Sequence, residues 1–388
     1  MELNTVLTGG HSQMVLCLGV NAGGQVASGG EGGEVCFWSP DGEIVSQKSF
    51  PSRADVNSVC FPPQQGSVVY VSAGEVIELL DIRSPECSQA TFAFHNEDVN
   101  QITVDPKDGF LAACDDDGLI KVIDLRSHKV LRTLKGHSAI CSSVRYHPTV
   151  PREIASGGLD CVVHLWETTR ASPRTSVNMR EVTAAGMEDE LMPSPYMVNP
   201  PFVHSLDFSP AGDVLACGLE SARVQLLGRG GRRDLWPGAS LEGHTRGVTQ
   251  VAFVPNHPGR TQDLLLTAGN DCRMMLWETA NITSEDSFLP ENSPSITSAD
   301  KLETIDLTST KSKIPPAYQS SGSGRERESD KRNQGACSSA LKKKKATLSM
   351  KHKDKINWLA PSTSVGSVNL VFVADVSEII SVYQWKLA

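Results

Sequence analysis

The 388-residue chain is 39% hydrophobic and 21% charged, which is the balance of an ordinary globular protein, and only 6% of its residues are aromatic. Its formal net charge of −9 argues against a general affinity for nucleic acid, because phosphate binding needs a positive surface. The ten cysteines occur singly, with no Cys-x-x-Cys pair, so the sequence lacks zinc-ligand spacing and favours a reducing compartment. With no signal-peptide pattern and no apolar window long enough to span a bilayer, we expect an intracellular protein, nuclear or cytoplasmic or both.

Similar segments recur along the chain, and each ends in a large side chain. The strong copies, residues 28–38, 156–166 and 267–277, end in Trp38, Trp166 and Trp277, and weaker copies end at Leu80, Ile123, Leu227 and Tyr383. The endpoints at 38, 80, 123 and 166 are separated by 42, 43 and 43 residues, a period typical of WD40 repeats. The later intervals of 61, 50 and 106 residues indicate insertions between units.

A Gly-His pair opens the strong repeats, and short apolar stretches follow it. Gly136-His137 and Gly243-His244 are the clearest pairs, and Gly10-His11 is a variant. The stretches alternate apolar and polar residues and are bounded by Gly, Pro or Asn, which is typical of short antiparallel strands. These features resemble the WD40 family, and the resemblance implies an all-β, seven-bladed propeller over residues 1–388. Residues 3–7 are predicted to be the outer strand of the last blade, paired with residues 379–383.

Two of the repeats contain the same set of polar residues. The sets are His137, Ser156, Asp160 and Trp166, and His244, Thr267, Asp271 and Trp277. Because the set recurs from repeat to repeat, a single catalytic centre of the hydrolase type is the wrong interpretation. The resemblance to WD40 repeats implies instead a structural hydrogen-bond network. With no Gly-rich phosphate loop, metal-ligand spacing or isolated nucleophile motif, we expect no enzyme activity, catalytic residue, cofactor or metal.

Two insertions interrupt the repeats. Residues 170–200 contain Glu188-Asp189-Glu190 and four prolines, which predicts a mobile acidic loop between blades 4 and 5. Residues 284–352 are rich in Ser, Thr, Lys and Pro, which predicts a long disordered loop between blades 6 and 7. This second insertion carries a split basic cluster of Lys331, Arg332, Lys342, Lys343, Lys344 and Lys345. The cluster fits a bipartite nuclear-import signal, a plain solvated charge run, or, less well, a nucleic-acid-binding tail.

Two consecutive repeats end in the same kind of tetrapeptide. Leu80-Asp81-Ile82-Arg83 and Ile123-Asp124-Leu125-Arg126 keep the Asp of the WD dipeptide and place an Arg two residues after it. Each Arg is predicted to lie at the turn after the third strand, where its planar guanidinium suits carbonyl and carboxylate partners and the Asp orients it. The alternative is that Asp is an ordinary turn residue and Arg an ordinary surface residue. Both insertions are expected to leave the Arg turns clear, because connections between blades lie on the opposite face.

The paired tetrapeptides resemble the double WDxR boxes of substrate receptors for the cullin-4 RING ubiquitin ligases. That resemblance implies docking through Asp81, Arg83, Asp124 and Arg126 on the adaptor, damaged-DNA-binding protein 1, and recruitment of an unidentified substrate protein. The alternative function is a WD40 scaffold subunit of another complex without a ligase role. Neither interpretation requires a membrane or a nucleic acid.

Overall fold

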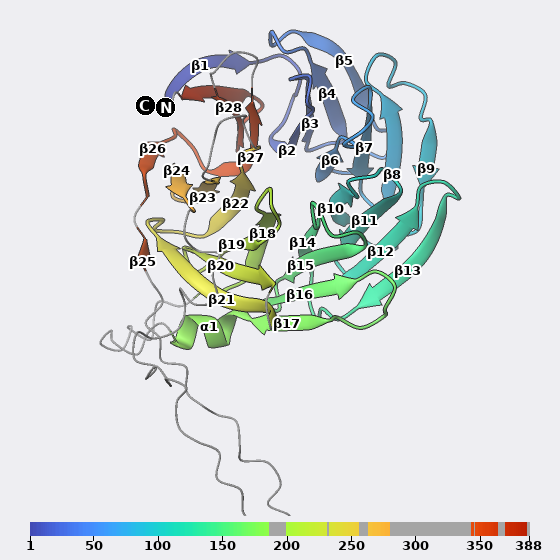
Figure 1. Ribbon diagram of the computed structural model, residues 1–388. Coiled ribbons are helices and arrows are strands. Elements are labelled where there is room, and N and C mark those ends of the chain that lie inside the picture. Colours follow the sequence, from blue (N-terminus) through green and yellow to red (C-terminus); the bar gives the residue numbers. More distant parts are fainter. Residues whose placement is uncertain are drawn as a thin grey trace, which may run out of the picture. The chain divides into compact units, whose positions relative to one another are not determined.

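The computed structural model of the protein describes residues 1–185, 199–230, 233–255, 263–279, 343–344, 346–363 and 369–385. In these ranges the chain forms seven sheets, the blades, which follow one another around a ring and are antiparallel except for one short parallel pair in blade 5 (Figure 1). Each blade has four strands, and blade 5 carries a short fifth strand on its outer edge. The prediction of an all-β, seven-bladed propeller is confirmed.

The strands are given from the innermost to the outermost in each blade. Blades 1 to 3 consist of β2 (Val15–Val20), β3 (Val26–Gly30), β4 (Glu34–Trp38) and β5 (Ile44–Ser49); β6 (Ser58–Cys60), β7 (Val68–Ala73), β8 (Val76–Asp81) and β9 (Ala90–Phe92); and β10 (Val99–Val104), β11 (Phe110–Asp115), β12 (Leu119–Asp124) and β13 (Lys129–Lys135). Blades 4 and 5 consist of β14 (Cys141–Tyr146), β15 (Glu153–Gly158), β16 (Val162–Glu167) and β17 (Thr175–Asn178); and β18 (Val203–Phe208), β19 (Val214–Leu219), β20 (Arg223–Gly230), β21 (Arg233–Glu242) and β25 (Lys343–Lys344). Blades 6 and 7 consist of β22 (Val248–Phe253), β23 (Leu264–Gly269), β24 (Arg273–Glu278) and β26 (Leu348–Lys351); and β27 (Ile356–Thr363), β28 (Asn369–Asp375), β29 (Ile380–Trp385) and β1 (Glu2–Leu7).

The second strand of a blade is buried on both faces, because the neighbouring blades cover it. Strands β7 and β23 are buried along their whole length, which explains why they read as continuous runs of apolar and small residues rather than alternating ones. Small residues allow the next blade to approach closely. A Cβ added at Gly157 would lie 2.4 Å from Cγ1 of Val203, on the inner strand of blade 5. Packing between blades therefore forms the core.

Side-chain hydrogen bonds also join the inner strands from blade to blade around the ring. They include Ile102 N to Ser58 Oγ (3.1 Å), Val144 N to Gln101 Oε1 (2.9 Å), Leu206 N to Ser143 Oγ (3.0 Å), Val251 N to Ser205 Oγ (3.2 Å), Thr249 Oγ1 to the Ile356 carbonyl (2.6 Å) and Asn357 Nδ2 to the Val15 carbonyl (3.0 Å). Most of these groups are buried, so the bonds satisfy polar atoms that would otherwise destabilise the ring.

The ring closes through the beginning of the chain. Strand β1 is the outer strand of blade 7 and pairs antiparallel with β29, with Leu3 opposite Tyr383 and Leu7 opposite Ile380. The pairing predicted for residues 3–7 is therefore confirmed.

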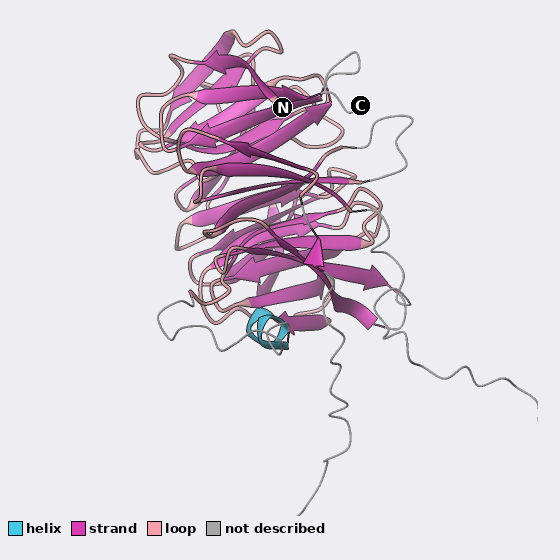
Figure 2. Cartoon of the chain, turned by 90° about the vertical axis from the view of Figure 1, so that its left-hand side faces the viewer, coloured by secondary structure: helices cyan, strands magenta, loops and turns pink. Residues whose placement is uncertain are grey.

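The connections between strands lie on two faces of the ring. Because successive strands of a blade run in opposite directions, its connections alternate between these faces. The face we call the linker face holds the connections from blade to blade and the turns between second and third strands, for example residues 8–14 and 31–33. The face we call the hairpin face holds the other connections, for example residues 82–89 and 125–128. Figure 2 shows the strands from the side, with loops gathered at both of their ends.

The first predicted insertion, residues 170–200, is too wide. Its early part contains β17, the outer strand of blade 4, followed by α1 (Met179–Ala185). Asn178 is the N-cap of this helix, which was not predicted from the sequence. Its Oδ1 accepts a hydrogen bond from Arg180 N (3.0 Å), and its Nδ2 donates to Glu181 Oε1 (3.2 Å). The predicted mobility of the acidic part concerns residues 186–198, which lie outside the described residues.

The second predicted insertion, residues 284–352, is also too wide, and its position was wrong in one respect. It does precede the last blade, but its final residues include β26, the outer strand of blade 6. The insertion therefore separates the third and fourth strands of blade 6 rather than blade 6 from blade 7. Strand β26 could not be predicted from the sequence because it has only four residues, and its two apolar side chains, Leu348 and Met350, are only half-buried. The predicted disorder is also wrong at Lys343–Lys344, which form β25, whereas residues 284–342 and 345 lie outside the described ranges.

Candidate functional site

The turn after β8 holds Arg83 in one orientation. Asp81, the last residue of β8, accepts hydrogen bonds from Arg83 N (2.9 Å), Nε (3.0 Å) and Nη2 (2.7 Å). The Arg83 side chain is nevertheless 73% exposed, whereas that of Asp81 is 14% exposed. The hydrogen bonds from the Arg83 side chain lower the pKa of Asp81 to about 2, so this carboxylate stays ionised. The remaining guanidinium donors point to solvent in a fixed fork.

The turn after β12 uses its Asp differently. Asp124 accepts hydrogen bonds from the backbone of Arg126 (2.9 Å) and Ser127 (3.1 Å), and these two bonds hold its pKa below the ordinary value. Arg126 is exposed, and its guanidinium has no hydrogen-bond or ion-pair partner in the part of the chain that the structure describes. Arg83 is thus oriented in advance, whereas Arg126 is free to adapt.

The two arginines occupy equivalent places in neighbouring blades. The residue between each Asp and Arg donates its backbone N–H to the preceding loop of the same blade, from Ile82 to the Ser67 carbonyl (3.1 Å) and from Leu125 to the Gly109 carbonyl (3.0 Å). Both turns join a third to a fourth strand, so both arginines lie on the hairpin face.

A third arginine, which the sequence analysis missed, follows the third strand of blade 4. Arg170 is 67% exposed, and its Nε lies 3.5 Å from Oε2 of Glu167, the last residue of β16. The turn matches the other two, because Thr168 N donates to the Arg152 carbonyl (2.8 Å) as Ile82 N does in blade 2. Its motif is Trp166-Glu167-Thr168-Thr169-Arg170, with Glu for Asp and Arg one place later. A search that allowed both changes would have found it.

The expectation that both insertions lie on the face opposite to the Arg turns is wrong for the longer one. Residues 186–198 connect blade 4 with blade 5, which is a connection on the linker face. The longer insertion begins after Thr279, whose N–H donates to the Asp263 carbonyl (3.0 Å) as Ile82 N does in its own turn. It therefore leaves the ring on the hairpin face, the same face that carries Arg83 and Arg126.

Blades 4 and 6 bring their predicted polar residues together. In blade 4, His137 Nδ1 lies 3.1 Å from both carboxylate oxygens of Asp160, and its Nε2 lies 2.8 Å from Ser156 Oγ. Trp166 Nε1 donates to the same hydroxyl at 2.8 Å. Since a carboxylate can only accept, Nδ1 carries the proton and Nε2 accepts from the hydroxyl.

Blade 6 repeats this arrangement, as a structural role requires. His244 Nδ1 lies 3.0 Å from Asp271 Oδ1, its Nε2 lies 2.8 Å from Thr267 Oγ1, and Trp277 Nε1 donates to that hydroxyl at 2.9 Å. Burial opposes ionisation of both Asp residues, but the hydrogen bonds that they accept outweigh it and hold their pKa values below the ordinary one. These side chains are almost fully buried and tie the linker-face loop of each blade to its second and third strands.

Three further blades contain variants of the network that the sequence analysis did not assign. In blade 7, His352 bonds both Asp375 Oδ2 and Tyr383 Oη at 2.7 Å, so Tyr383 stands in for Trp. In blade 3, His95 Nδ1 lies 2.8 Å from Asp115 Oδ2, and in blade 1, His11 Nε2 lies 2.7 Å from Ser28 Oγ. The available signal was a His before each inner strand with an Asp or Ser in the second strand.

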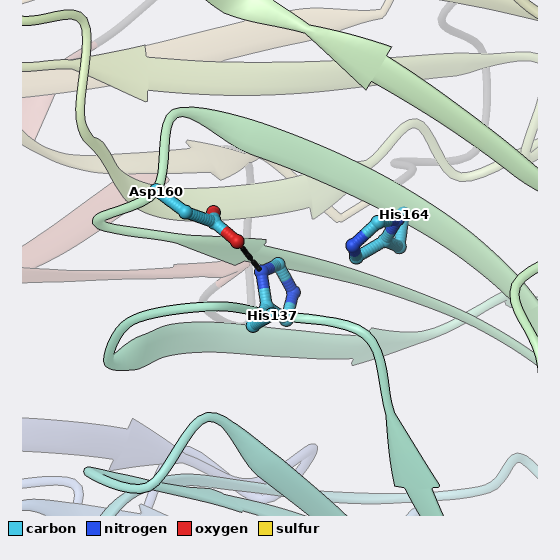
Figure 3. Close-up of side chains that lie close together, drawn as sticks. All are labelled: His137, Asp160 and His164. Carbon is cyan, nitrogen blue, oxygen red and sulfur yellow. Dashed lines mark hydrogen bonds and ion pairs between the residues drawn. The ribbon is translucent and has the colours of Figure 1, made fainter.

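A second histidine beside the blade 4 network gives it metal-like spacing. Figure 3 shows His164 next to His137 and Asp160, and one ligand atom from each lies within 4.8 Å of the others. His164 Nδ1 lies 2.7 Å from Ser176 Oγ, and burial lowers the pKa of His164 to about 4. Both ring nitrogens of His137 already have partners, which a metal ion would have to displace. We therefore assign the cluster to hydrogen bonding within the blade.

Within the described ranges, none of the helices is long and apolar enough to cross a membrane.

Comparison with known proteins agrees with the repeat pattern. Residues 86–124, 128–167 and 236–278 match the family model described as "WD domain, G-beta repeat". The chain is 26% identical over 291 residues to a Dictyostelium discoideum protein described as "WD repeat-containing protein 53 homolog", an alignment that covers 70% of this chain and 77% of that protein. It is 32% identical over 119 residues to "Protein SLOW WALKER 1" of Arabidopsis thaliana, which covers 31% of this chain and 22% of that protein.

Proposed function

We propose that this chain, a seven-bladed β-propeller with segments that match WD40 repeats, is a non-catalytic protein-interaction scaffold. Its specific role is that of a substrate receptor of a cullin-4 RING ubiquitin ligase. In this role it docks on the adaptor, damaged-DNA-binding protein 1, and presents an unidentified substrate protein. The observation that carries the proposal is the pair of exposed arginines, Arg83 and Arg126, at equivalent turns of adjacent blades.

The geometry of these turns supports a docking role. Asp81 fixes the guanidinium of Arg83 while most of that side chain stays exposed, so little conformational entropy is lost when a partner binds. The free guanidinium of Arg126 supplies donors that can adapt to the partner's carbonyl or carboxylate groups. Asp81 and Asp124 shape the turns and act on the partner only through the arginines.

We expect Arg83→Ala and Arg126→Ala each to weaken adaptor binding by more than about tenfold, because interface arginines are often hot spots. The double variant should lose co-purification of both the adaptor and cullin-4. Because both side chains are on the surface, the melting temperature should change by no more than about 1 °C. Tagged protein pulled down from cells and probed for the adaptor is the measurement.

Lys107→Ala is the matched control, because Lys107 is an exposed cation in a neighbouring hairpin-face loop of blade 3. It should bind the adaptor as the parent does. A folded double Arg variant that still retains the adaptor would refute the docking role and leave the alternative, a scaffold subunit of another complex.

We also propose that the split basic cluster directs nuclear import. Lys331, Arg332, Lys342 and Lys345 lie outside the described residues, and of Lys343 and Lys344 only the backbone is described, as β25. Replacing Lys342 to Lys345 with Ala should shift a fluorescent fusion from nucleus to cytoplasm without changing its melting temperature, because the charges act on an import receptor. An unchanged distribution would identify the cluster as a solvated charge run.

A further inference from the structure

Blade 1 lacks the acid that completes the network of blades 4 and 6. His11 Nε2 lies 2.7 Å from Ser28 Oγ, and Trp38 Nε1 donates to the same hydroxyl at 2.8 Å, as in those blades. The place of Asp160, four residues after the Ser, is taken by Gly32.

The missing acid leaves His11 Nδ1 without a hydrogen-bond partner among the described residues, although His11 is only 7% exposed. Glu34 replaces the acid in part. Its carboxylate accepts from Ser12 N (2.8 Å) and Ser12 Oγ (2.7 Å), as Asp160 accepts from Ser138 N, but its Oε2 stays 3.8 Å from His11 Nδ1. Burial lowers the pKa of His11 to about 4. At neutral pH, therefore, the His11 ring is uncharged and does not neutralise the Glu34 carboxylate.

A pocket of about 350 Å³ lies at this position on the linker face. Its lining is Ser12, Gln13, Gly32, Glu34, Ser49, Phe50, Pro51 and Arg53. Glycine suits the turn that borders the pocket, since φ is +72° at Gly32, a conformation that other residues rarely adopt. The two histidine rings lie in the same way in their blades. A Cβ added at Gly30 would lie 2.8 Å from His11 Nδ1, and one added at Gly158 would lie 2.7 Å from His137 Nδ1. His11 Nδ1 therefore faces the space that the Asp160 carboxylate fills in blade 4.

On the side of blades 2 and 3, the surroundings of the pocket are acidic. The linker-face loops of blades 1 to 3 carry the acids Glu31, Asp55, Glu75, Glu97, Asp98, Asp116 and Asp117, all of them exposed except the half-buried Glu31. Among the described residues of those loops, 8–14, 31–33, 50–57, 74–75, 93–98 and 116–118, the cationic side chain is Arg53. A surface on which one sign of charge predominates attracts ligands of the opposite sign.

We propose that this pocket receives a lysine or arginine side chain from a basic segment of a protein partner. The cation pairs with Glu34, whose side chain is 25% exposed, and its aliphatic stem packs on Phe50 and Pro51. The acidic loops of blades 2 and 3 hold the neighbouring cations of the segment. This site lies on the opposite face from Arg83 and Arg126, so it does not depend on adaptor docking.

The test uses the purified full-length chain and two short dye-labelled peptides, one alternating lysine with serine and the other glutamate with serine. In fluorescence anisotropy the lysine peptide should bind and the glutamate peptide should not. Glu34→Gln keeps an acceptor for Ser12 and should weaken binding about threefold to tenfold. Arg53→Glu should strengthen it by a similar factor, which provides a second test if Glu34→Gln fails to fold.

Glu86→Gln is the matched control, because it removes one exposed negative charge from the hairpin face. It should leave the affinity unchanged. If Glu86→Gln weakens binding as much as Glu34→Gln, diffuse charge explains the binding and the pocket assignment is overturned. Failure of the lysine peptide to bind the parent protein overturns it as well. Neither outcome affects the adaptor proposal, which is measured on Arg83 and Arg126.

Discussion

Replacing Arg229 with Ala should destabilise the propeller by about 3 kcal/mol, because it leaves a buried carboxylate without its hydrogen-bonded arginine. Glu153, the first residue of β15, is 2% exposed. Arg229 on β20 donates two hydrogen bonds to its carboxylate, from Nε to Oε1 at 2.8 Å and from Nη2 to Oε2 at 2.6 Å. The remaining cation, Arg174, reaches Glu153 only at 3.8 Å and is itself bonded to Asp234 at 2.8 Å. This ion pair joins blade 4 to blade 5.

The melting temperature should fall by about 5 °C in Arg229→Ala, given the usual entropy of unfolding per residue. Arg126→Ala is the control, since it removes an exposed arginine without a partner among the described residues, and it should change little. The double variant Glu153→Met, Arg229→Met should recover most of the loss, because no unpaired charge remains. A stability of Arg229→Ala equal to that of Arg126→Ala would show that the pair contributes nothing.

The third strand of each blade could be predicted from the sequence because its side chains are distinctive. Trp38, Trp166 and Trp277 are almost fully buried, and the weaker endpoints Leu80 and Ile123 occupy the same position in their blades. Large side chains recur there because each must fill the same space against the neighbouring blade.

The outer strands could not be predicted equally well. Strands β17 and β26 have only four residues each and are held by backbone hydrogen bonds to the third strand, so one or two apolar side chains, Val177 or Leu348 and Met350, are too few to form a recognisable pattern. Composition then assigned both to the adjoining insertions. That error also put the longer insertion on the wrong face, because a connection inside blade 6 ends on the face opposite to one between blades.

Of the candidate site, the sequence could indicate the residues but not their surroundings. The tetrapeptides ending in Arg83 and Arg126 have a fixed spacing, whereas Arg170 has a spacing longer by one residue. Glu153 and Arg229 are 76 residues apart, and only the stacking of blades 4 and 5 brings them together. The repeats show Gly32 in the place of Asp160, but that this leaves a pocket lined by Phe50 and Pro51 follows only from the fold.

The closure of the ring rests on one strand that is far in sequence from its partners. Each segment that matches the repeat family begins at the fourth strand of one blade and ends at the third strand of the next. The repeat and the blade are therefore out of phase by one strand, and blade 7 must take its outer strand, β1, from the other end of the chain. Most of β1 is exposed, but Leu7 is 3% exposed and packs in a cluster with Trp38 and Ile380.

Deletion of residues 1–8 should destabilise the whole propeller by about 4 kcal/mol or more. Loss of Leu7 removes about 2 kcal/mol of apolar burial, and the lost ladder to β29 removes several backbone hydrogen bonds, worth about 0.5–1.5 kcal/mol each. The uncovered edge of β29 should also promote association between molecules, visible as concentration-dependent light scattering.

Leu3→Ala is the matched control for the deletion, because Leu3 is 54% exposed, and it should melt at the same temperature as the parent protein. Leu7→Ala should account for about half of the loss. A truncated protein that melts within about 1 °C of the parent would show that the ring is held by packing between blades alone.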